Sequence, residues 1–164
     1  MVDHQIDKFN SITFGNNLDI DNVLAVVDGY IRQENSAYKI TVGSDSELVG
    51  EKKAHFVIAI VVHRVGHGAI YFWGEVTKSG IGSLRQRIYE EATYSLSLAQ
   101  CLLDKFKDLN LPLEKLLEIH VDIGEIGETR VLINEVVGMV RGSGFTCYTK
   151  PFSFAASNVA DRHT

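Results

Sequence analysis

Residues 55–64 (HFVIAIVVHR) constrain the fold of this chain more than any other segment. The segment is apolar at nearly every position, whereas a strand with one face in water would alternate apolar and polar residues. It therefore predicts a central strand that is covered on both faces. The chain must supply elements that pack on the two sides of a sheet, which indicates a layered α/β fold.

Two further strands are predicted beside this central one. Residues 39–46 precede it and are rich in Ile, Thr and Val, and residues 69–76 follow it and are rich in aromatic side chains. Short turn segments separate the three strands, so each is expected to run antiparallel to the next. The first half of the chain thus predicts a three-stranded meander.

The second half alternates helices with strands. Helical periodicity predicts a long helix over residues 84–106, stopped before Pro112, a helix over 130–140 and a short last helix over 154–163. Strands are predicted over 116–123 and 145–149. Strand–helix–strand crossovers join parallel neighbours, so the fourth and fifth strands are expected to run parallel to the first. The expected fold is α/β, a mixed five-stranded sheet with helices on both faces.

The totals agree with one globular domain. The chain has 164 residues, of which 45% are hydrophobic and 23% charged. We expect a single domain over residues 18–164, led by a helix over 18–35, and a polar N-terminal arm over 1–17. Neither a membrane span nor a signal peptide is predicted, which favours a cytoplasmic protein.

Charge and cysteine content exclude several classes of protein. A formal net charge of −5 argues against a protein that coats nucleic acid through bulk electrostatics, although a local basic rim remains compatible with it. Cys101 and Cys147 have no metal-binding spacing, so we expect buried thiols rather than a zinc site or a disulfide framework.

Two aspartates lie at or near the ends of predicted strands. Asp45 ends the first strand and Asp122 falls near the end of the fourth. If these strands are adjacent and parallel, both carboxylates lie at one edge of the sheet, where each raises the pKa of the other unless a cation is bound. Oxygen ligands without cysteine favour Mg²⁺ or Mn²⁺. The plainer alternative is that each aspartate only terminates a strand as turn residues do.

Asp161 and a glutamate of the long helix are the other candidate ligands. Asp161 lies in the last turn of a helix, where the helix dipole disfavours an acid unless a cation is near; Arg162 or a metal ion could supply that charge. Glu91 lies at the margin of the buried helix face beside Ala92, whereas Glu90 points further out and could pair with Arg87. Glu91 is therefore the preferred ligand, with Glu90 left as the alternative.

Basic residues near predicted element ends could contact a phosphate backbone. As isolated charges they are equally consistent with solubility. These residues are Lys78, Arg85, Arg87, Arg130, Lys150 and Arg162.

Several stretches together resemble the YkuK-type family of bacterial proteins, a largely uncharacterised family described as ribonuclease H-like. The resemblance covers residue 39 to the C-terminus, and its last stretch is the most specific. The stretches are TVGSDS (41–46), AIVVHR (59–64), RIYEE (87–91), IHVDIG (119–124), NEVVGMV (134–140) and KPFSFAASNVAD (150–161).

This resemblance implies an inherited acidic site made of Asp45, Glu91, Asp122 and Asp161. In active ribonuclease H-like enzymes such carboxylates hold two Mg²⁺ ions, typically ~3.5–4 Å apart, which activate water and stabilise the leaving oxygen. The implied function is a Mg²⁺- or Mn²⁺-dependent nuclease acting on RNA, an RNA–DNA hybrid or structured DNA. The alternative is a binding or scaffold protein that keeps the fold and the acids without turnover.

Overall fold

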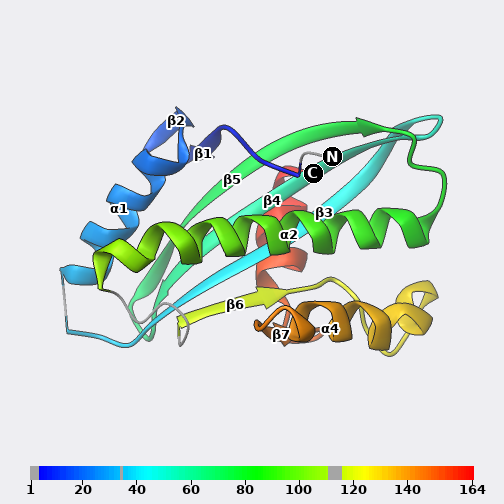
Figure 1. Cartoon of the computed structure of the whole chain (residues 1–164). Helices are drawn as coiled ribbons and strands as arrows, with labels where there is room; N and C mark the ends of the chain where they lie inside the picture. The colour runs from blue at the N-terminus through cyan, green and yellow to red at the C-terminus, as the bar shows by residue number, and fades with distance from the viewer. Residues whose placement is uncertain (1–3, 34, 111–115) are drawn as a thin grey trace.

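The computed structural model describes residues 4–33, 35–110 and 116–164, and these form a seven-stranded mixed sheet with helices on both faces (Figure 1). Across the sheet the strand order is β2-β1-β5-β4-β3-β6-β7. The strands are β1 (Phe9–Ser11), β2 (Gly15–Leu18), β3 (Tyr38–Gly50), β4 (Lys53–Arg64), β5 (Gly68–Ser79), β6 (Leu117–His120) and β7 (Thr146–Tyr148). The helical elements are α1 (Ile20–Arg32), α2 (Leu84–Phe106), η1 (Lys107–Leu109), η2 (Glu128–Leu132), α4 (Ile133–Gly142), η3 (Ala155–Ala160) and α5 (Asp161–His163).

Strands β3, β4 and β5 form the predicted antiparallel meander, and β4 is buried on both faces. Ile58 belongs to the main core, which α2 covers, while Val57 and Ala59 form a second small cluster with Ala160 of η3. In Figure 1, α2 crosses the front of the sheet and the C-terminal helix lies behind it. The prediction from residues 55–64 of a strand covered on both sides is confirmed.

The parallel part of the sheet is also as predicted. Strand β6 pairs in parallel with β3, with Gly43 beside His120, and β7 pairs in parallel with β6. No helix within the described ranges is both long and apolar enough to cross a membrane.

The prediction of five strands is wrong, because the N-terminal segment adds β1 and β2 at the β5 edge. Asn10 of β1 pairs with Trp73 of β5, and Phe9 is fully buried. Gly74 makes this contact possible: a Cβ there would clash with Cγ2 of Ile6 and lie 2.9 Å from the carbonyl oxygen of Lys8. Residues 9–18 are too polar to predict strands, so their pairing depends on tertiary contacts.

The helix ends differ slightly from those predicted. Asp19 caps α1 by accepting a 2.8 Å hydrogen bond from the backbone of Asn22, so the leading helix starts at Ile20 rather than at residue 18. The predicted stop at Pro112 lies outside the described residues. The last helix forms as predicted, but η3 is wound as a π-helix, in which residues five apart face the same way; accordingly Ala155 and Ala160 are both fully buried.

Candidate metal centre

Asp45 does not end its strand as predicted, because β3 continues in pairing with β4 to Gly50; it lies on the sheet face that η3 covers. It pairs in register with Val57, a member of the small cluster around Ala160. Its side chain is half-buried, and Oδ2 accepts a 3.0 Å hydrogen bond from the hydroxyl of Thr164. Burial raises the pKa of Asp45, and the carboxylates of Asp122 and Asp161 raise it further. The hydrogen bond from Thr164 lowers this pKa and offsets part of the rise. Asp45 thus has the electrostatic environment that a bound cation would relieve.

Asp122 follows β6 and lies beside Asp45. Gly43 is the neighbour of His120 in the parallel ladder, so two residues further along each strand Asp45 and Asp122 share the same face. Hydrogen bonds from Val121 N to Tyr148 O at 3.0 Å and from Lys150 N to Ile123 O at 2.9 Å hold this segment against the chain after β7. Adjacency of the two acids therefore follows from the register of the backbone.

One oxygen of Asp122 is buried without a hydrogen bond. Oδ1 has no hydrogen-bond partner, although the Lys150 ammonium lies 3.1 Å away and forms an ion pair with it. The contact between the Lys150 ammonium and Asp122 Oδ1 does not have the geometry of a hydrogen bond, but the opposite charges of the two groups still attract. Carboxylate oxygens of this kind are the ligands that hard divalent cations take.

Glu91 approaches β3 from α2, on the sheet face opposite to that of Asp45, and is close enough to feel the charges of Asp45 and Asp122. Its side chain is buried, and Oε1 accepts a 2.5 Å hydrogen bond from the hydroxyl of Ser46. Burial raises the pKa of Glu91 to about 8; the Ser46 hydrogen bond opposes the rise, while the charges of Asp45 and Asp122 add to it. Without a cation, this carboxyl is protonated at neutral pH.

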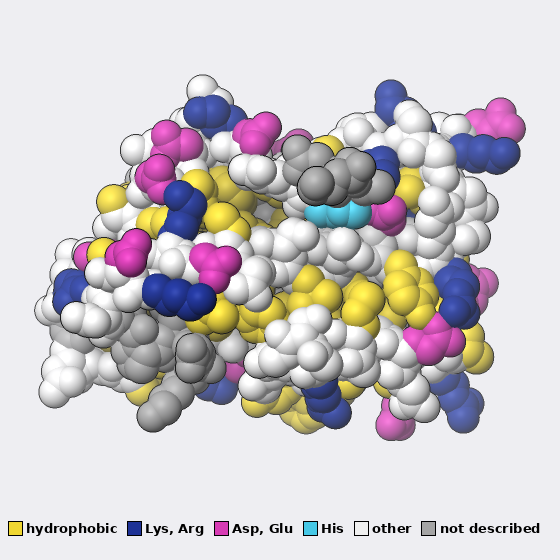
Figure 2. All heavy atoms as spheres, in the orientation of Figure 1, with side chains coloured by type: hydrophobic (Ala, Val, Ile, Leu, Met, Phe, Trp, Pro, Cys, Tyr) yellow, Lys and Arg dark blue, Asp and Glu magenta, His cyan; other side chains and the backbone are white. Residues whose placement is uncertain are grey.

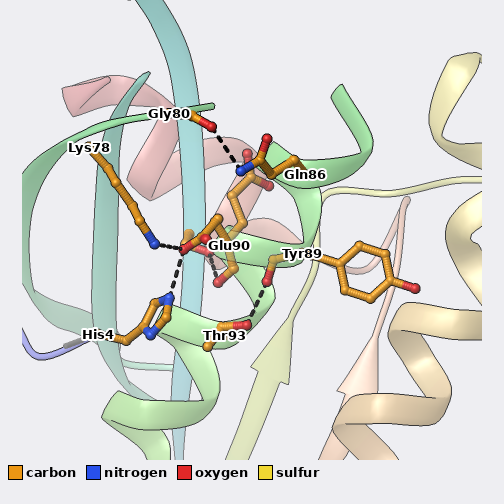
Figure 3. Close-up of polar contacts among 9 residues, drawn as sticks. His4, Lys78, Gly80, Gln86, Tyr89, Glu90 and Thr93 are labelled. Carbon is orange, nitrogen blue, oxygen red and sulfur yellow. Dashed lines mark hydrogen bonds and ion pairs between the residues drawn. The ribbon is translucent and has the colours of Figure 1, made fainter. Parts of the chain in front are cut away.

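Glu90 points elsewhere and pairs with other residues. Oε2 of Glu90 lies 2.7 Å from Nζ of Lys78 and 2.7 Å from Nε2 of His4, which converge on it from β5 and from the N-terminal segment (Figure 3). Burial opposes these two partners, but together they lower the pKa of Glu90. The suggested pairing with Arg87 is therefore replaced by one with Lys78 and His4.

Asp161 is exposed and opens α5 directly after the π-helical segment. It is close enough to Asp45 to raise the pKa of that residue. Thr164, one turn further on, donates a hydrogen bond from its hydroxyl to Asp45. The C-terminal segment thus brings Asp161 to the sheet face that carries Asp45 and Asp122.

Asp45, Asp122 and Asp161 lie on one side of the sheet and Glu91 lies on the α2 side, so the four acids form no closed ligand shell. Across the ranges that the structure describes, no three His, Cys, Asp or Glu side chains stand together in an arrangement that would hold one metal ion. The donor set fits a hard divalent cation in kind, since all four candidates are carboxylates.

Comparison with known proteins identifies the family. A family model described as Ribonuclease H-like matches residues 22–164. The chain belongs to the ribonuclease H-like family. A curated relative, "Uncharacterized protein YkuK" of Bacillus subtilis (strain 168), is 31% identical over 157 residues, which cover 87% of this chain and 89% of the relative. No solved structure matches the chain. The resemblance seen in the sequence is confirmed.

The basic residues of this ribonuclease H-like chain fall into different settings. Lys150 pairs with Asp122, Lys78 with Glu90, and Arg85 with Glu135 at 2.6 Å. Nε of Arg87 is buried without a hydrogen-bond partner, and its charge opposes the raised pKa of Glu91. Arg130 and Arg162 are exposed. In Figure 2, acidic and basic side chains are interspersed over the face shown.

The serines flanking Asp45 are the site residues that sequence reasoning missed. Ser44 and Ser46 alternate with Asp45 along β3 and therefore point to the opposite face, toward α2. The hydroxyl of Ser44 donates to the carbonyl oxygen of Glu91 at 2.7 Å, and that of Ser46 donates to its carboxyl group. In the sequence, the signal for these contacts was the alternation of Ser44 and Ser46 with Asp45, which places the two hydroxyls on one face of a strand.

Proposed function

We propose that this ribonuclease H-like chain is a metal-dependent nuclease that hydrolyses phosphodiester bonds in RNA, an RNA–DNA hybrid or structured DNA. The observation that carries the proposal is the adjacency of Asp45 and Asp122 on parallel strands, with one oxygen of Asp122 buried and lacking a hydrogen bond. Glu91 and Asp161 supply the remaining carboxylates. Mg²⁺ or Mn²⁺ is the cation that these oxygen donors suit.

Each acid has a distinct role in this proposal. Two bound cations would supply an activated water and charge stabilisation for the leaving oxygen. Asp45 and Asp122 would be the main ligands of these cations, and Glu91 and Asp161 would supply further carboxylate oxygens. Glu91 must give up its proton first, and Ser46 then donates to the ionised carboxylate and fixes its orientation.

Lys150 supports substrate binding in the same scheme. Its ammonium group balances Asp122 in the metal-free chain, at 3.1 Å. Once released, this half-exposed side chain lies at the edge of the acidic site, where it contacts a phosphate of the nucleic acid backbone. The segment expected as an N-terminal arm belongs to the same domain, because β1 and β2 extend the sheet at the β5 edge.

A cleavage assay tests the function. The chain is incubated with labelled single-stranded RNA, RNA–DNA hybrid and branched DNA in Mg²⁺, Mn²⁺ or EDTA. We expect cleavage of at least one substrate with metal, none in EDTA, and a loss of at least about a hundredfold in Asp45→Asn and Asp122→Asn. Glu47→Gln, an exposed acid two residues along β3, is the matched control and should keep full activity. Cleavage that survives Asp45→Asn rejects the assignment.

A binding or scaffold protein is the second candidate. The ion pair between Lys150 and Asp122 favours it, because a side chain of the protein already balances the charge of one candidate ligand. In that case the chain binds nucleic acid equally well in EDTA and in Mg²⁺, and no substrate is cleaved. The same set of reactions, read by gel mobility instead of product formation, separates the two candidates.

A further inference from the structure

His120 of β6 is a buried histidine beside the candidate metal centre. Its side chain is 1% exposed, and it occupies the sheet face of Asp45 because its register partner Gly43 lies two residues before Asp45. Nδ1 accepts a 3.2 Å hydrogen bond from the backbone N–H of Ala155, the first residue of η3. Nε2 lies 3.0 Å from Oε1 of Glu118. Since Nδ1 is an acceptor, the ring proton resides on Nε2 and is donated to Glu118.

Glu118 is held in its ionised form and so fixes this arrangement. Burial opposes ionisation, but the His120 hydrogen bond and the nearby Lys39 charge lower the pKa of Glu118. The Lys39 ammonium lies 3.6 Å from Oε2, and the Thr41 hydroxyl lies 3.4 Å from Oε1. A carboxylate can only accept a hydrogen bond, so it keeps the proton on Nε2 and leaves Nδ1 free to accept from Ala155.

Aromatic packing fixes the imidazole ring as well. Phe154 meets it edge-on with ring centroids 4.6 Å apart, and Tyr148 does so at 5.7 Å. The ring therefore cannot swing away from the start of η3. At 1% exposure, the His120 side chain is as enclosed as the core residues Ile40 and Leu102.

The C-terminal helical segment is bonded to His120 at its start and reaches the acidic site at its end. Ala155 and Ala160 bury the π-helical turn against the sheet, Asp161 follows at once, and the Thr164 hydroxyl donates to Asp45. A hydrogen bond at each end thus ties this short segment to one sheet face. A shift at its start would move Asp161 relative to Asp45.

We propose that His120 is a positioning residue, which fixes the start of the C-terminal helical segment through Nδ1 and thereby sets Asp161 and Thr164 against Asp45. His120 makes no hydrogen bond with any of the four acids. The positioning itself is a property of the fold, and its use for metal binding rests on the proposed nuclease function.

Two substitutions separate this role from simple packing. In His120→Asn the side-chain oxygen takes the place of Nδ1 and can still accept from Ala155, whereas in His120→Gln the polar group lies one methylene further out. His63→Gln, a half-buried strand histidine of β4, is the matched control. Positioning predicts that Asn preserves the C-terminal segment and that Gln loosens it.

The first readout needs no metal ion. Trp73 is the sole tryptophan of the sequence, and its ring stacks on His163 at 3.7 Å between centroids and 6° between planes. Its fluorescence therefore reports docking of the C-terminal segment. We expect His120→Gln to shift the emission to longer wavelength and to speed amide exchange over residues 158–164 about tenfold, with His120→Asn and His63→Gln close to wild type. Equal behaviour of the Asn and Gln variants overturns the proposal.

The second readout is Mn²⁺ affinity of the full chain by electron paramagnetic resonance. We expect an affinity loss of about tenfold in His120→Gln and recovery in His120→Asn. A loosened segment with unchanged affinity overturns the link to the metal site. A wild-type chain that binds no Mn²⁺ rejects the proposed function instead, while emission and exchange still decide the positioning.

If neither His120 variant folds, Glu118→Gln must give the same emission shift to a smaller extent; wild-type emission in that variant overturns the proposal.

Discussion

The hydroxyl of Ser46 donates a 2.5 Å hydrogen bond to the carboxyl group of Glu91, which ties the middle of β3 to α2 beside the candidate metal centre. The preceding residue of the helix, Glu90, faces a different environment, with Lys78 and His4 each 2.7 Å away. One glutamate is therefore buried beside other acids, and its neighbour is paired with cations. This contrast gives the two residues opposite effects on stability.

Glu91→Gln should stabilise the metal-free chain at neutral pH. The pKa of Glu91 is raised from the usual 4.5 to about 8, so the unfolded chain ionises over that interval while the folded chain keeps its proton. The stability of the wild type is therefore full below pH 4.5 and falls as pH rises toward 8. We expect the variant to gain roughly 3 kcal/mol over wild type at pH 7 and nothing at pH 4. Urea unfolding in EDTA at both pH values measures this; an equal effect at both would contradict the raised pKa.

Glu90→Gln should show the opposite dependence. The pKa of Glu90 is lowered, so its contribution to stability is present above pH 4.5 and is lost as pH falls through the folded-state pKa. We expect a loss of about 1 kcal/mol at pH 7 that disappears in acid. The same unfolding series serves as the measurement. A loss that persists at pH 3 would mean that packing, not charge, explains the effect.

Gly74→Ala should detach the N-terminal segment from β5. The added Cβ would clash with Ile6 and lie 2.9 Å from the carbonyl oxygen of Lys8, which is backbone and cannot rotate away. We expect a destabilisation of about 1–3 kcal/mol and faster amide exchange over residues 5–11. Gly29→Ala in α1 is the control, since no atom lies within 4 Å of its added Cβ, and it should stabilise by about 0.5–1 kcal/mol. Unchanged exchange in Gly74→Ala would show that the segment is not held there.

Lys150→Gln should strengthen metal binding. The Lys150 ammonium lies 3.1 Å from Asp122 and competes with a cation for that oxygen. Because the side chain is half-exposed, the gain is modest, about fivefold in Mn²⁺ affinity. Lys105→Gln, which removes a 2.7 Å ion pair with Asp21 far from the acids, should leave the affinity unchanged. Weaker binding in Lys150→Gln would show that Lys150 helps to hold the metal site together.

The central sheet was predictable because its signals are local. An unbroken apolar run predicted a strand buried on both faces, and strand–helix–strand crossovers predicted that the strand before Asp122 runs parallel to that of Asp45. That the two strands are direct neighbours came from the structure. The different surroundings of the two glutamates were likewise predictable, because Glu91 lies at the margin of the buried helix face and Glu90 points further out.

The remaining features depend on contacts that no local pattern carries. Strand β1 forms because Gly74, far along the chain, leaves room for Ile6. His4 reaches Glu90 across a sequence separation of 86 residues. The π-helical winding of η3 escapes prediction because ordinary helical spacing places Ala155 and Ala160 on different sides, whereas both are buried. The hydroxyl contacts of Ser44 and Ser46 could not be predicted, because they depend on how α2 packs over β3.

Mn²⁺ binding to the metal-free chain, compared with Asp45→Asn and the Glu47→Gln control, tests the carboxylate centre most directly. We expect the wild type and Glu47→Gln to bind Mn²⁺ with equal affinity, and Asp45→Asn to bind at least about a hundredfold more weakly. Isothermal titration calorimetry at pH 8, close to the raised pKa of Glu91 of about 8, gives the three affinities. Equal binding by Asp45→Asn and wild type, or no binding by wild type at millimolar Mn²⁺, would contradict the assignment of these acids to a metal centre.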